Sequence, residues 1–349
     1  MYRFLRPALF KFDPENAHQL TLQLVRLAGY QPFRAVLSKI YETPDKPVEA
    51  FGLRFKNPVG LAAGYDKDGV AIRGLSALGF GHLEIGTVTP RPQPGNPKPR
   101  VFRLVEDEAV INRMGFPGRG ADFVAVTLRG ALKGRRGNLP SDNGTIIGVN
   151  LGKNKDTPLE EAAGDYIMLM RQFIFMVDFL TINISSPNTV GLRRLQGREM
   201  LEQLLGAIAK ERKEIALGRG GDAPVLVKLA PDLSEEELDD AIDVILRTGM
   251  DGIIATNTTL AREGLRSKHQ GETGGLSGRP LTGRADEALA QVVKKVEGRI
   301  PIVGVGGIMS PEDAQRKLDL GATLVQVYTG LVYAGPGLVK DIVKKLRKL

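Results

Sequence analysis

The chain has 349 residues, 42% of them apolar, which is enough for one large barrel or two ordinary domains with a globular core. It has no cysteine, which excludes disulfides, thiolate metal sites, a protein-held iron–sulfur cluster and a cysteine nucleophile, and fits a cytosolic compartment. The three histidines lack the spacing of a metal site, so no metal is expected. With 48 basic and 40 acidic residues the net charge is +8, which suits an anionic partner such as phosphate, carboxylate, lipid headgroups or nucleic acid.

The N-terminus predicts two short amphipathic helices. Residues 1–12 place apolar side chains on one stripe, with Arg3, Arg6 and Lys11 between them. Asp13 and Pro14 have the residue types of an N-cap and a first helical position, and the second stripe ends at Gly29. Such a basic hairpin either lies on a membrane surface or packs on its own domain. No apolar stretch approaches the roughly 20 residues that span a bilayer, and charges interrupt the N-terminus, so we expect neither a membrane-spanning helix nor a cleavable signal peptide.

A repeating pattern of short apolar runs begins after Gly52. The eight runs that we predict as strands are residues 59–64, 82–87, 146–152, 179–184, 225–230, 252–257, 302–307 and 324–329. Helical stretches lie between most of them, with Thr157, Ser234 and Ser310 as predicted N-caps. Strands alternating with helices pair in parallel through right-handed crossovers, so we predict an α/β fold, a (β/α)8 TIM barrel with a small N-terminal helical extension. A doubly wound sheet is the alternative, but no G-x-G-x-x-G follows the first strand.

Polar residues gather where the predicted strands end. The run from 178 to 184 stops abruptly in Asn183, Ser185, Ser186, Asn188 and Thr189. This cluster is either an ordinary turn or part of the site that a barrel carries at the carboxyl ends of its strands. Small residues at 304–307 and 328–330 follow the last two strands, where phosphate commonly binds; ordinary turns are the alternative. Two long segments, 90–114 and 262–281, interrupt the alternation and are predicted to be lids or walls of the site.

The same strand ends lack several catalytic constellations. They hold lysines and asparagines, but no pair of carboxylates, which excludes the usual glycoside hydrolysis, and no set of metal ligands for metal-assisted hydrolysis. With no obvious protein acid or nucleophile apart from serine, we expect a bound cofactor to carry the chemistry.

Seven stretches resemble one family, the dihydroorotate dehydrogenases, and within it the membrane-associated, quinone-reducing class. The stretches are NPVGLAAGYDKDG at 57–69, EIGTVTPRPQPG at 84–95, INRMGF at 111–116, NLGKNKD at 150–156, LTINISSPNT at 180–189, ATNTT at 255–259 and GGLSGRPL at 274–281. They cover nearly the whole chain in the family's order. One departure is Pro117, where asparagine is expected in many relatives, and it affects the predicted shape of the local lid.

The resemblance implies FMN as cofactor and dihydroorotate as substrate, oxidised to orotate in pyrimidine (UMP) biosynthesis with a membrane quinone as final electron acceptor. The implied FMN contacts are Ala63, Gly64, Tyr65, Asp66, Lys67, Thr87, Asn150, Asn183, Lys228, Thr256, Gly278, Gly307, Tyr328 and Thr329. The implied substrate contacts are Lys67, Asn112, Arg113, Met114, Gly115, Phe116, Asn183, Asn188, Asn257 and Thr258. His18 and Arg103 occupy positions that the family uses near the quinone head.

Ser186 is the catalytic base that the resemblance implies, and serine rather than cysteine there indicates the quinone class. A hydroxyl acts as a base only if its own proton moves on, and Thr189, Thr258 or an ordered water are the alternatives for that relay. Without the resemblance, a serine that merely caps a turn is the simpler interpretation.

The resemblance also implies how the chain is divided and where it works. Residues 1–45 form a helical hood for membrane and quinone access, and residues 46–349 form the FMN-binding barrel. The protein is expected to be peripheral, on the cytoplasmic side of a bacterial inner membrane, with no nucleic acid and no obligatory protein subunit as partner. A tRNA dihydrouridine synthase would also be an FMN barrel suited by the charge, but normally needs a cysteine acid. A non-catalytic binding barrel would be expected to lose part of the rim.

Overall fold

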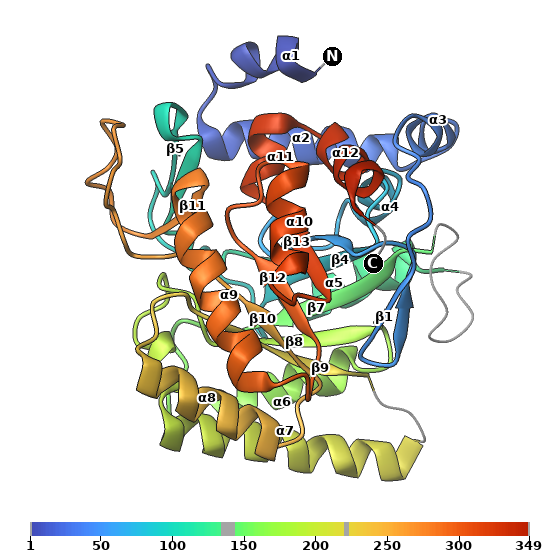
Figure 1. Ribbon diagram of the computed structural model, residues 1–349. Coiled ribbons are helices and arrows are strands. Elements are labelled where there is room, and N and C mark those ends of the chain that lie inside the picture. The colour runs from blue at the N-terminus through green and yellow to red at the C-terminus, as the bar shows by residue number, and fades with distance from the viewer. Residues whose placement is uncertain (1, 134–143, 220–222, 348–349) are drawn as a thin grey trace.

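The computed structural model describes residues 2–133, 144–219 and 223–347. Its centre is a closed barrel of eight parallel strands (Figure 1). In chain order they are β3 Val59–Leu61, β4 His82–Val88, β7 Ile146–Leu151, β8 Phe179–Asn183, β9 Val225–Leu229, β10 Gly252–Ala255, β12 Ile302–Val305 and β13 Leu324–Val327. Neighbours in the chain are neighbours in the barrel, and β13 closes it by pairing with β3. The predicted (β/α)8 barrel is therefore confirmed.

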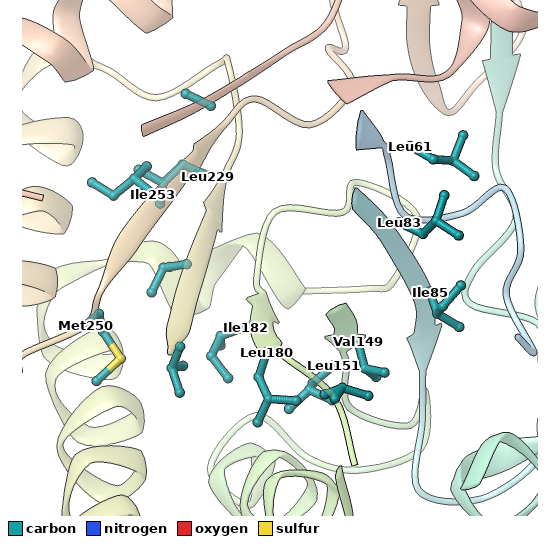
Figure 2. Packing of buried hydrophobic residues seen from close by; sticks show 14 of the residues in the cluster. Leu61, Leu83, Ile85, Val149, Leu151, Leu180, Ile182, Leu229, Met250 and Ile253 are labelled. Atoms are coloured by element: carbon teal, nitrogen blue, oxygen red, sulfur yellow. The ribbon is translucent and has the colours of Figure 1, made fainter. Parts of the chain in front are cut away.

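An outer ring of helices surrounds these strands. It comprises α4 Ile72–Ser76, α5 Gly120–Ala131, α6 Ala162–Phe173, α7 Arg198–Arg219, α8 Glu235–Arg247, α9 Thr282–Val296, α10 Pro311–Asp319 and α12 Gly337–Lys345. A short helix, α11 Thr329–Ala334, follows β13 directly. The main apolar core lies between strands and helices, and Figure 2 shows Leu83, Val149 and Leu180 from three consecutive strands within it. Truncating one such leucine to alanine costs about 2–5 kcal/mol.

Two of the three predicted N-caps are confirmed. Ser234 caps α8 in a reciprocal capping box with Glu237, and Ser310 accepts the backbone N–H of Asp313 at the start of α10. The third prediction was wrong, because α6 begins only at Ala162 and Thr157 does not cap it. The Thr157 hydroxyl instead donates to the Asp165 carboxylate at 2.8 Å.

Alternation along the strands sends a second set of side chains to the barrel axis. At the amino end the hairpin of β1 Val48–Ala50 and β2 Leu53–Phe55 closes the barrel, with Phe55 packed against His82. Gly60 makes this possible, because a Cβ there would lie 2.0 Å from the His82 ring. Towards the carboxyl end the inward residues become polar, including Glu84, Asn150 and Lys228. The fold thus places a polar surface inside one end of an otherwise apolar barrel.

The two long segments that interrupt the alternation meet in one antiparallel sheet. Strands β5 Val101–Leu104 and β6 Ala109–Asn112 come from the first segment, and β11 Gly275–Gly278 comes from the second. The 3-10 helices η1 Val105–Asp107 and η3 Arg279–Leu281 flank this sheet, and a third, η2 Leu192–Gln196, follows β8. The sequence predicted that these segments form lids or walls of the site. It did not predict the pairing of β6 with β11, which joins residues about 160 positions apart.

The N-terminus forms three helices, α1 Tyr2–Leu9, α2 Pro14–Ala28 and α3 Phe33–Ile40, of which the sequence patterns predicted the first two. Asp13 caps α2 as predicted, accepting the N–H groups of Glu15 and Asn16 at 3.0 Å. Figure 1 shows these blue helices gathered at one end of the molecule, next to α11 and α12. Within the described ranges no helix is both long and apolar enough to cross a membrane.

Candidate active site

A cavity of about 650 Å³ lies at the carboxyl end of the barrel. The barrel strands form its floor, the antiparallel sheet contributes Val101, Val110 and Ser277, and α1 and α2 close it from above. The cavity therefore joins a polar region inside the barrel to an apolar region beneath the N-terminal helices.

A hydrogen-bonded amide network forms the polar floor. Asn150 is central: its Oδ1 accepts from the Thr87 hydroxyl at 2.5 Å and from the Asn183 amide at 2.9 Å. Its own amide donates to Glu84 Oε1 at 2.6 Å. Lys228 Nζ lies 3.8 Å from Glu84 Oε2, and both side chains are buried. One carboxylate thus balances the ammonium group and fixes which way the Asn150 amide faces.

Ser186 faces the same cavity from the loop after β8. Its residue is 5% exposed, and its Oγ accepts the backbone N–H of Asn188 at 3.3 Å. The Thr258 hydroxyl also lines the cavity, and it is buried without a hydrogen-bond partner among the described residues. The Thr189 hydroxyl is likewise buried and unpartnered, but Thr189 does not line the cavity. Of the two hydroxyls proposed for a proton relay, only that of Thr258 therefore shares the cavity with Ser186.

The loops after β12 and β13, which the sequence predicted to be either a phosphate site or ordinary turns, approach one another closely. Gly306 and Gly307 have φ values of +99° and +71°, a region that favours glycine. A Cβ on Gly307 would lie 2.3 Å from the Cα of Thr282, and one on Gly330 would lie 2.3 Å from the Ile308 carbonyl oxygen. Glycine is therefore required at these positions by the close packing around the two loops, both of which line the cavity.

The other wall of the polar region carries Lys67, which donates to the Gly64 carbonyl oxygen at 2.7 Å. Burial lowers the pKa of Lys67 to about 8, although the Glu15 carboxylate opposes that shift. Asn112 also lines the cavity, and its Oδ1 accepts from the Asn188 amide at 3.2 Å. Met114, Gly115 and Phe116 continue this wall.

His18 and Arg103 meet the cavity beneath the N-terminal helices. His18 Nε2 lies 2.8 Å from the Tyr65 carbonyl oxygen, which only accepts, so Nε2 carries the proton and Nδ1 is an acceptor. Burial lowers the pKa of His18 to about 4, with Lys67 adding to the effect, so the ring is neutral at physiological pH. The Arg103 guanidinium lies 4.2 Å from the centre of the Phe10 ring and donates to the Phe10 carbonyl oxygen at 3.1 Å.

Comparison with known proteins agrees with this geometry. The family model described as dihydroorotate dehydrogenase matches residues 47–349. The chain is 49% identical to the dihydroorotate dehydrogenase (quinone) of Edwardsiella ictaluri, over 99% of both chains, and 49% identical to that of Pectobacterium atrosepticum, over 98% of both. The solved structure of DHODH from Eimeria tenella in complex with ferulenol has a TM-score of 0.85 at 39% identity, covering 95% of this chain and 90% of that one.

The chain belongs to the dihydroorotate dehydrogenase family. Members of this family oxidise dihydroorotate in pyrimidine biosynthesis. Most residues that the sequence assigned to a dihydroorotate dehydrogenase site line the one cavity. They are His18, Ala63, Gly64, Tyr65, Lys67, Thr87, Arg103, Asn112, Met114, Gly115, Phe116, Asn183, Ser186, Asn188, Lys228, Thr256, Asn257, Thr258, Gly278, Gly307, Tyr328 and Thr329.

Three residues of that assignment lie behind the cavity wall of this dihydroorotate dehydrogenase fold. The Asp66 carboxylate accepts the N–H groups of Val70 and Ala71, and burial raises its pKa to about 6. The Arg113 side chain points outward to the Glu272 carboxylate at 2.7 Å, and Asn150 supports Thr87 and Asn183 from below. These three influence the site through their neighbours.

Sequence reasoning missed two polar residues of the dihydroorotate dehydrogenase site. Glu84 was read only as part of a motif, although a buried acid in an apolar strand signals a buried cationic partner. Ser185 was named only within the polar cluster after the fourth predicted strand, either a turn or part of the site, and was given no role of its own. Its hydroxyl links the ends of β8 and β10, donating to Asn183 Oδ1 at 3.1 Å and accepting from the Asn257 amide at 2.9 Å.

Proposed function

We propose that this chain oxidises dihydroorotate to orotate with FMN as hydride acceptor, and that a membrane quinone is the final electron acceptor. The observation that carries the proposal is the single cavity, in which Ser186 and Lys228 at the barrel end are continuous with His18 and Arg103 under the N-terminal helices. One ligand-sized space thus reaches both a site for a polar substrate and a site for an apolar acceptor.

The residues present fit FMN. The loops after β12 and β13 offer backbone donors for its phosphate, and the Lys228 ammonium faces the cavity with Glu84 behind it. Both amide atoms of Gln326, which lines the cavity, are buried without a partner among the described residues. A flavin edge, rich in donors and acceptors, would satisfy such atoms. When bound, FMN supplies the hydride acceptor and passes the electrons to the quinone.

The chain's own residues bind and deprotonate the substrate. Lys67 places a cation beside the carboxylate of dihydroorotate, and Asn112, Asn188 and Asn257 offer amides to its ring carbonyl and N–H groups. Ser186 Oγ takes the C5 proton as the hydride leaves C6, and its own proton moves on to Thr258, Thr189 or water. The unpartnered hydroxyls of both threonines supply the acceptors that this relay needs.

The quinone end uses one donor and one acceptor. Arg103 donates a hydrogen bond to a quinone carbonyl, and the free Nδ1 of neutral His18 accepts one from the hydroxyl of the reduced product. The apolar lining from α1 and α2, including Leu5, Leu9 and Leu24, accommodates the quinone tail.

Exposed apolar side chains of the N-terminal helices support docking on a membrane surface. Ten of the 17 large exposed apolar side chains in the described residues lie in this segment: Phe4, Leu5, Phe12, Leu20, Leu24, Leu27, Tyr30, Phe33, Val36 and Ile40. We accordingly assign residues 1–45 to a hood, residues 46–349 to the FMN-binding barrel, and the protein to the cytoplasmic surface of a bacterial inner membrane, without nucleic acid or an obligatory protein subunit.

An anaerobic titration tests this function. The purified protein is expected to show the yellow spectrum of an oxidised flavin, to bleach on addition of dihydroorotate and to regain colour on addition of a quinone. A colourless protein, or a flavin that dihydroorotate leaves oxidised, would refute it.

A further inference from the structure

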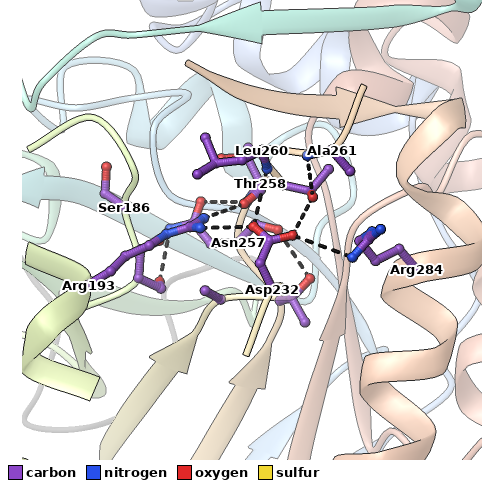
Figure 3. Close-up of polar contacts among 12 residues, drawn as sticks. Ser186, Arg193, Asp232, Asn257, Thr258, Leu260, Ala261 and Arg284 are labelled. Carbon is purple, nitrogen blue, oxygen red and sulfur yellow. Dashed lines mark hydrogen bonds and ion pairs between the residues drawn. The ribbon is translucent and has the colours of Figure 1, made fainter. Parts of the chain in front are cut away.

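The guanidinium group of Arg193, in η2, spans three loops at the rim of the barrel (Figure 3). Its Nε donates to the Ser185 carbonyl oxygen at 3.0 Å, and its Nη2 donates to the Thr258 carbonyl oxygen at 2.8 Å. Its Nη1 donates to the Asp232 carboxylate at 2.8 Å. The two charged side chains are each only about one-fifth exposed, at 21% and 20%.

The two carbonyl oxygens belong to two different loops, each of which carries residues assigned to the substrate site. Ser185 immediately precedes Ser186 after β8, and Thr258 immediately follows Asn257 after β10. Figure 3 shows the Ser186 side chain turned away from Arg193, so the guanidinium acts on the backbone beside the base rather than on the base itself. One planar group thereby fixes two backbone segments relative to each other.

Asp232, in the loop after β9, is the third partner of the Arg193 guanidinium. Besides Arg193, its carboxylate accepts from the Thr259 hydroxyl and from the backbone N–H of Leu260 at 3.2 Å. Arg284 Nη1 lies 3.9 Å from the same carboxylate. The anion therefore orients the guanidinium and holds the β10 loop at a second point.

We propose that Arg193 is a positioning residue that sets the separation between Ser186 and the substrate-holding pair Asn257 and Thr258, with Asp232 as its counter-ion; this rests on the proposed function. Only a rigid planar fork donates in these three directions at once, which a lysine ammonium on a flexible stem does not reproduce. A misplacement of about 1 Å can lower a rate about 100-fold. Losing the Arg193 contacts should therefore slow the removal of the substrate proton by Ser186.

The test separates the two half-reactions of the holoenzyme in Arg193→Lys and Asp232→Asn. We expect flavin reduction by dihydroorotate to slow about 100-fold in Arg193→Lys, with an enlarged isotope effect for substrate deuterated at C5. Asp232→Asn is expected to change both quantities in the same direction by less, since the guanidinium keeps its two carbonyl partners. Reoxidation by quinone, flavin content and melting temperature are expected to stay near wild type in both variants.

The control is Arg198→Gln, at the start of α7, because Arg198 pairs with Asp240 and Asp243 on the outer surface. It is expected to leave both half-reactions unchanged. Equal losses in both half-reactions together with loss of flavin, or wild-type flavin reduction in Arg193→Lys, would overturn the positioning role. If Arg193→Lys fails to fold, wild-type flavin reduction and isotope effect in Asp232→Asn overturn it instead. Failure of the proposed function is distinct, because dihydroorotate would then leave the wild-type flavin oxidised.

Discussion

Arg100 and Glu15 form a buried, two-point ion pair between the barrel rim and the first turn of α2. The guanidinium donates from Nη2 and Nε to the two carboxylate oxygens at 2.8 and 3.1 Å, and each side chain is 8% exposed. Arg100 Nη1 also donates to the carbonyl oxygens of Pro94 and Asn96. The pair therefore fastens the N-terminal helices to the long segment that borders the substrate site.

Breaking this pair in Glu15→Gln is expected to loosen the N-terminal helices, because Arg100 is left buried without its counter-ion at a cost of about 3–5 kcal/mol. Protease sensitivity and hydrogen exchange of residues 2–40 should rise, and the KM for a long-tailed quinone should rise with them. Flavin reduction by dihydroorotate should change little. Unaltered exchange in this segment would show that other contacts hold α2 in place.

The same pair predicts a loss of hood attachment in acid. Burial favours the neutral carboxyl of Glu15, but the hydrogen bonds and charges of Arg100 and Lys98 outweigh it, so the net pKa lies below its usual 4.5. A lowered pKa stabilises the fold above about pH 4.5, and that stability is lost as the pH falls through the folded value. Hydrogen exchange of α2 in the wild type should therefore accelerate below that pH, and Glu15→Gln should abolish the dependence.

The lowered pKa of Lys67 leads us to expect that ligand binding weakens at high pH, whereas the attachment of α2 weakens at low pH. Its pKa of about 8 means that the free site carries the ammonium only below that pH. Binding of anionic orotate should take up a proton above it, so the Kd should be constant below about pH 8 and rise about tenfold per pH unit above. Orotate titrations followed by the flavin spectrum measure this. Lys67→Arg, which stays charged throughout, should remove the rise, and a rise that persists in that variant would assign it to another group.

The fold was predicted from sequence patterns within a few residues. These patterns failed where a contact with a residue further along the chain determines the local structure. The eight strands and the caps at Ser234 and Ser310 follow from patterns within a few residues. The Thr157 cap failed because Asp165, eight residues away, takes the hydroxyl. The Arg193–Asp232 and Arg100–Glu15 pairs join residues 39 and 85 positions apart, and nothing local marks either partner. The residues at the carboxyl ends of the strands were assigned through motif resemblance. A motif indicates which residues form the site, but it does not indicate which ion pairs and hydrogen bonds fix their positions.

Lys228→Ala is expected to weaken FMN binding, because it removes the cation that faces the cavity and leaves Glu84 buried and uncompensated. The double variant Lys228→Ala/Glu84→Gln removes the buried charge as well. It should recover melting temperature but not FMN affinity, measured by flavin release. Recovery of both would mean that Lys228 serves only to neutralise Glu84.

Removal of residues 1–40 should impair the reaction at the quinone end of the cavity and leave the reaction at the substrate end intact. The truncated protein is expected to remain a flavoprotein that dihydroorotate reduces and a small water-soluble acceptor reoxidises, while turnover with a long-tailed quinone collapses. Binding to anionic vesicles should fall too, since Arg3 and Lys11 each add about 1 kcal/mol of attraction near such a surface. Leu217→Ser is the control, because Leu217 is 90% exposed but lies on α7. Full quinone turnover after truncation would remove the case for the hood.

The central claim is that Ser186 removes the C5 proton of dihydroorotate, and the rate of flavin reduction in Ser186→Ala tests it most directly. The account predicts a variant that retains FMN, binds orotate as the wild type does and passes electrons from chemically reduced flavin to quinone at the normal rate. Its flavin reduction by dihydroorotate should fall about 100- to 10,000-fold, the usual contribution of a positioned base. A variant that dihydroorotate reduces at nearly the wild-type rate would contradict the account.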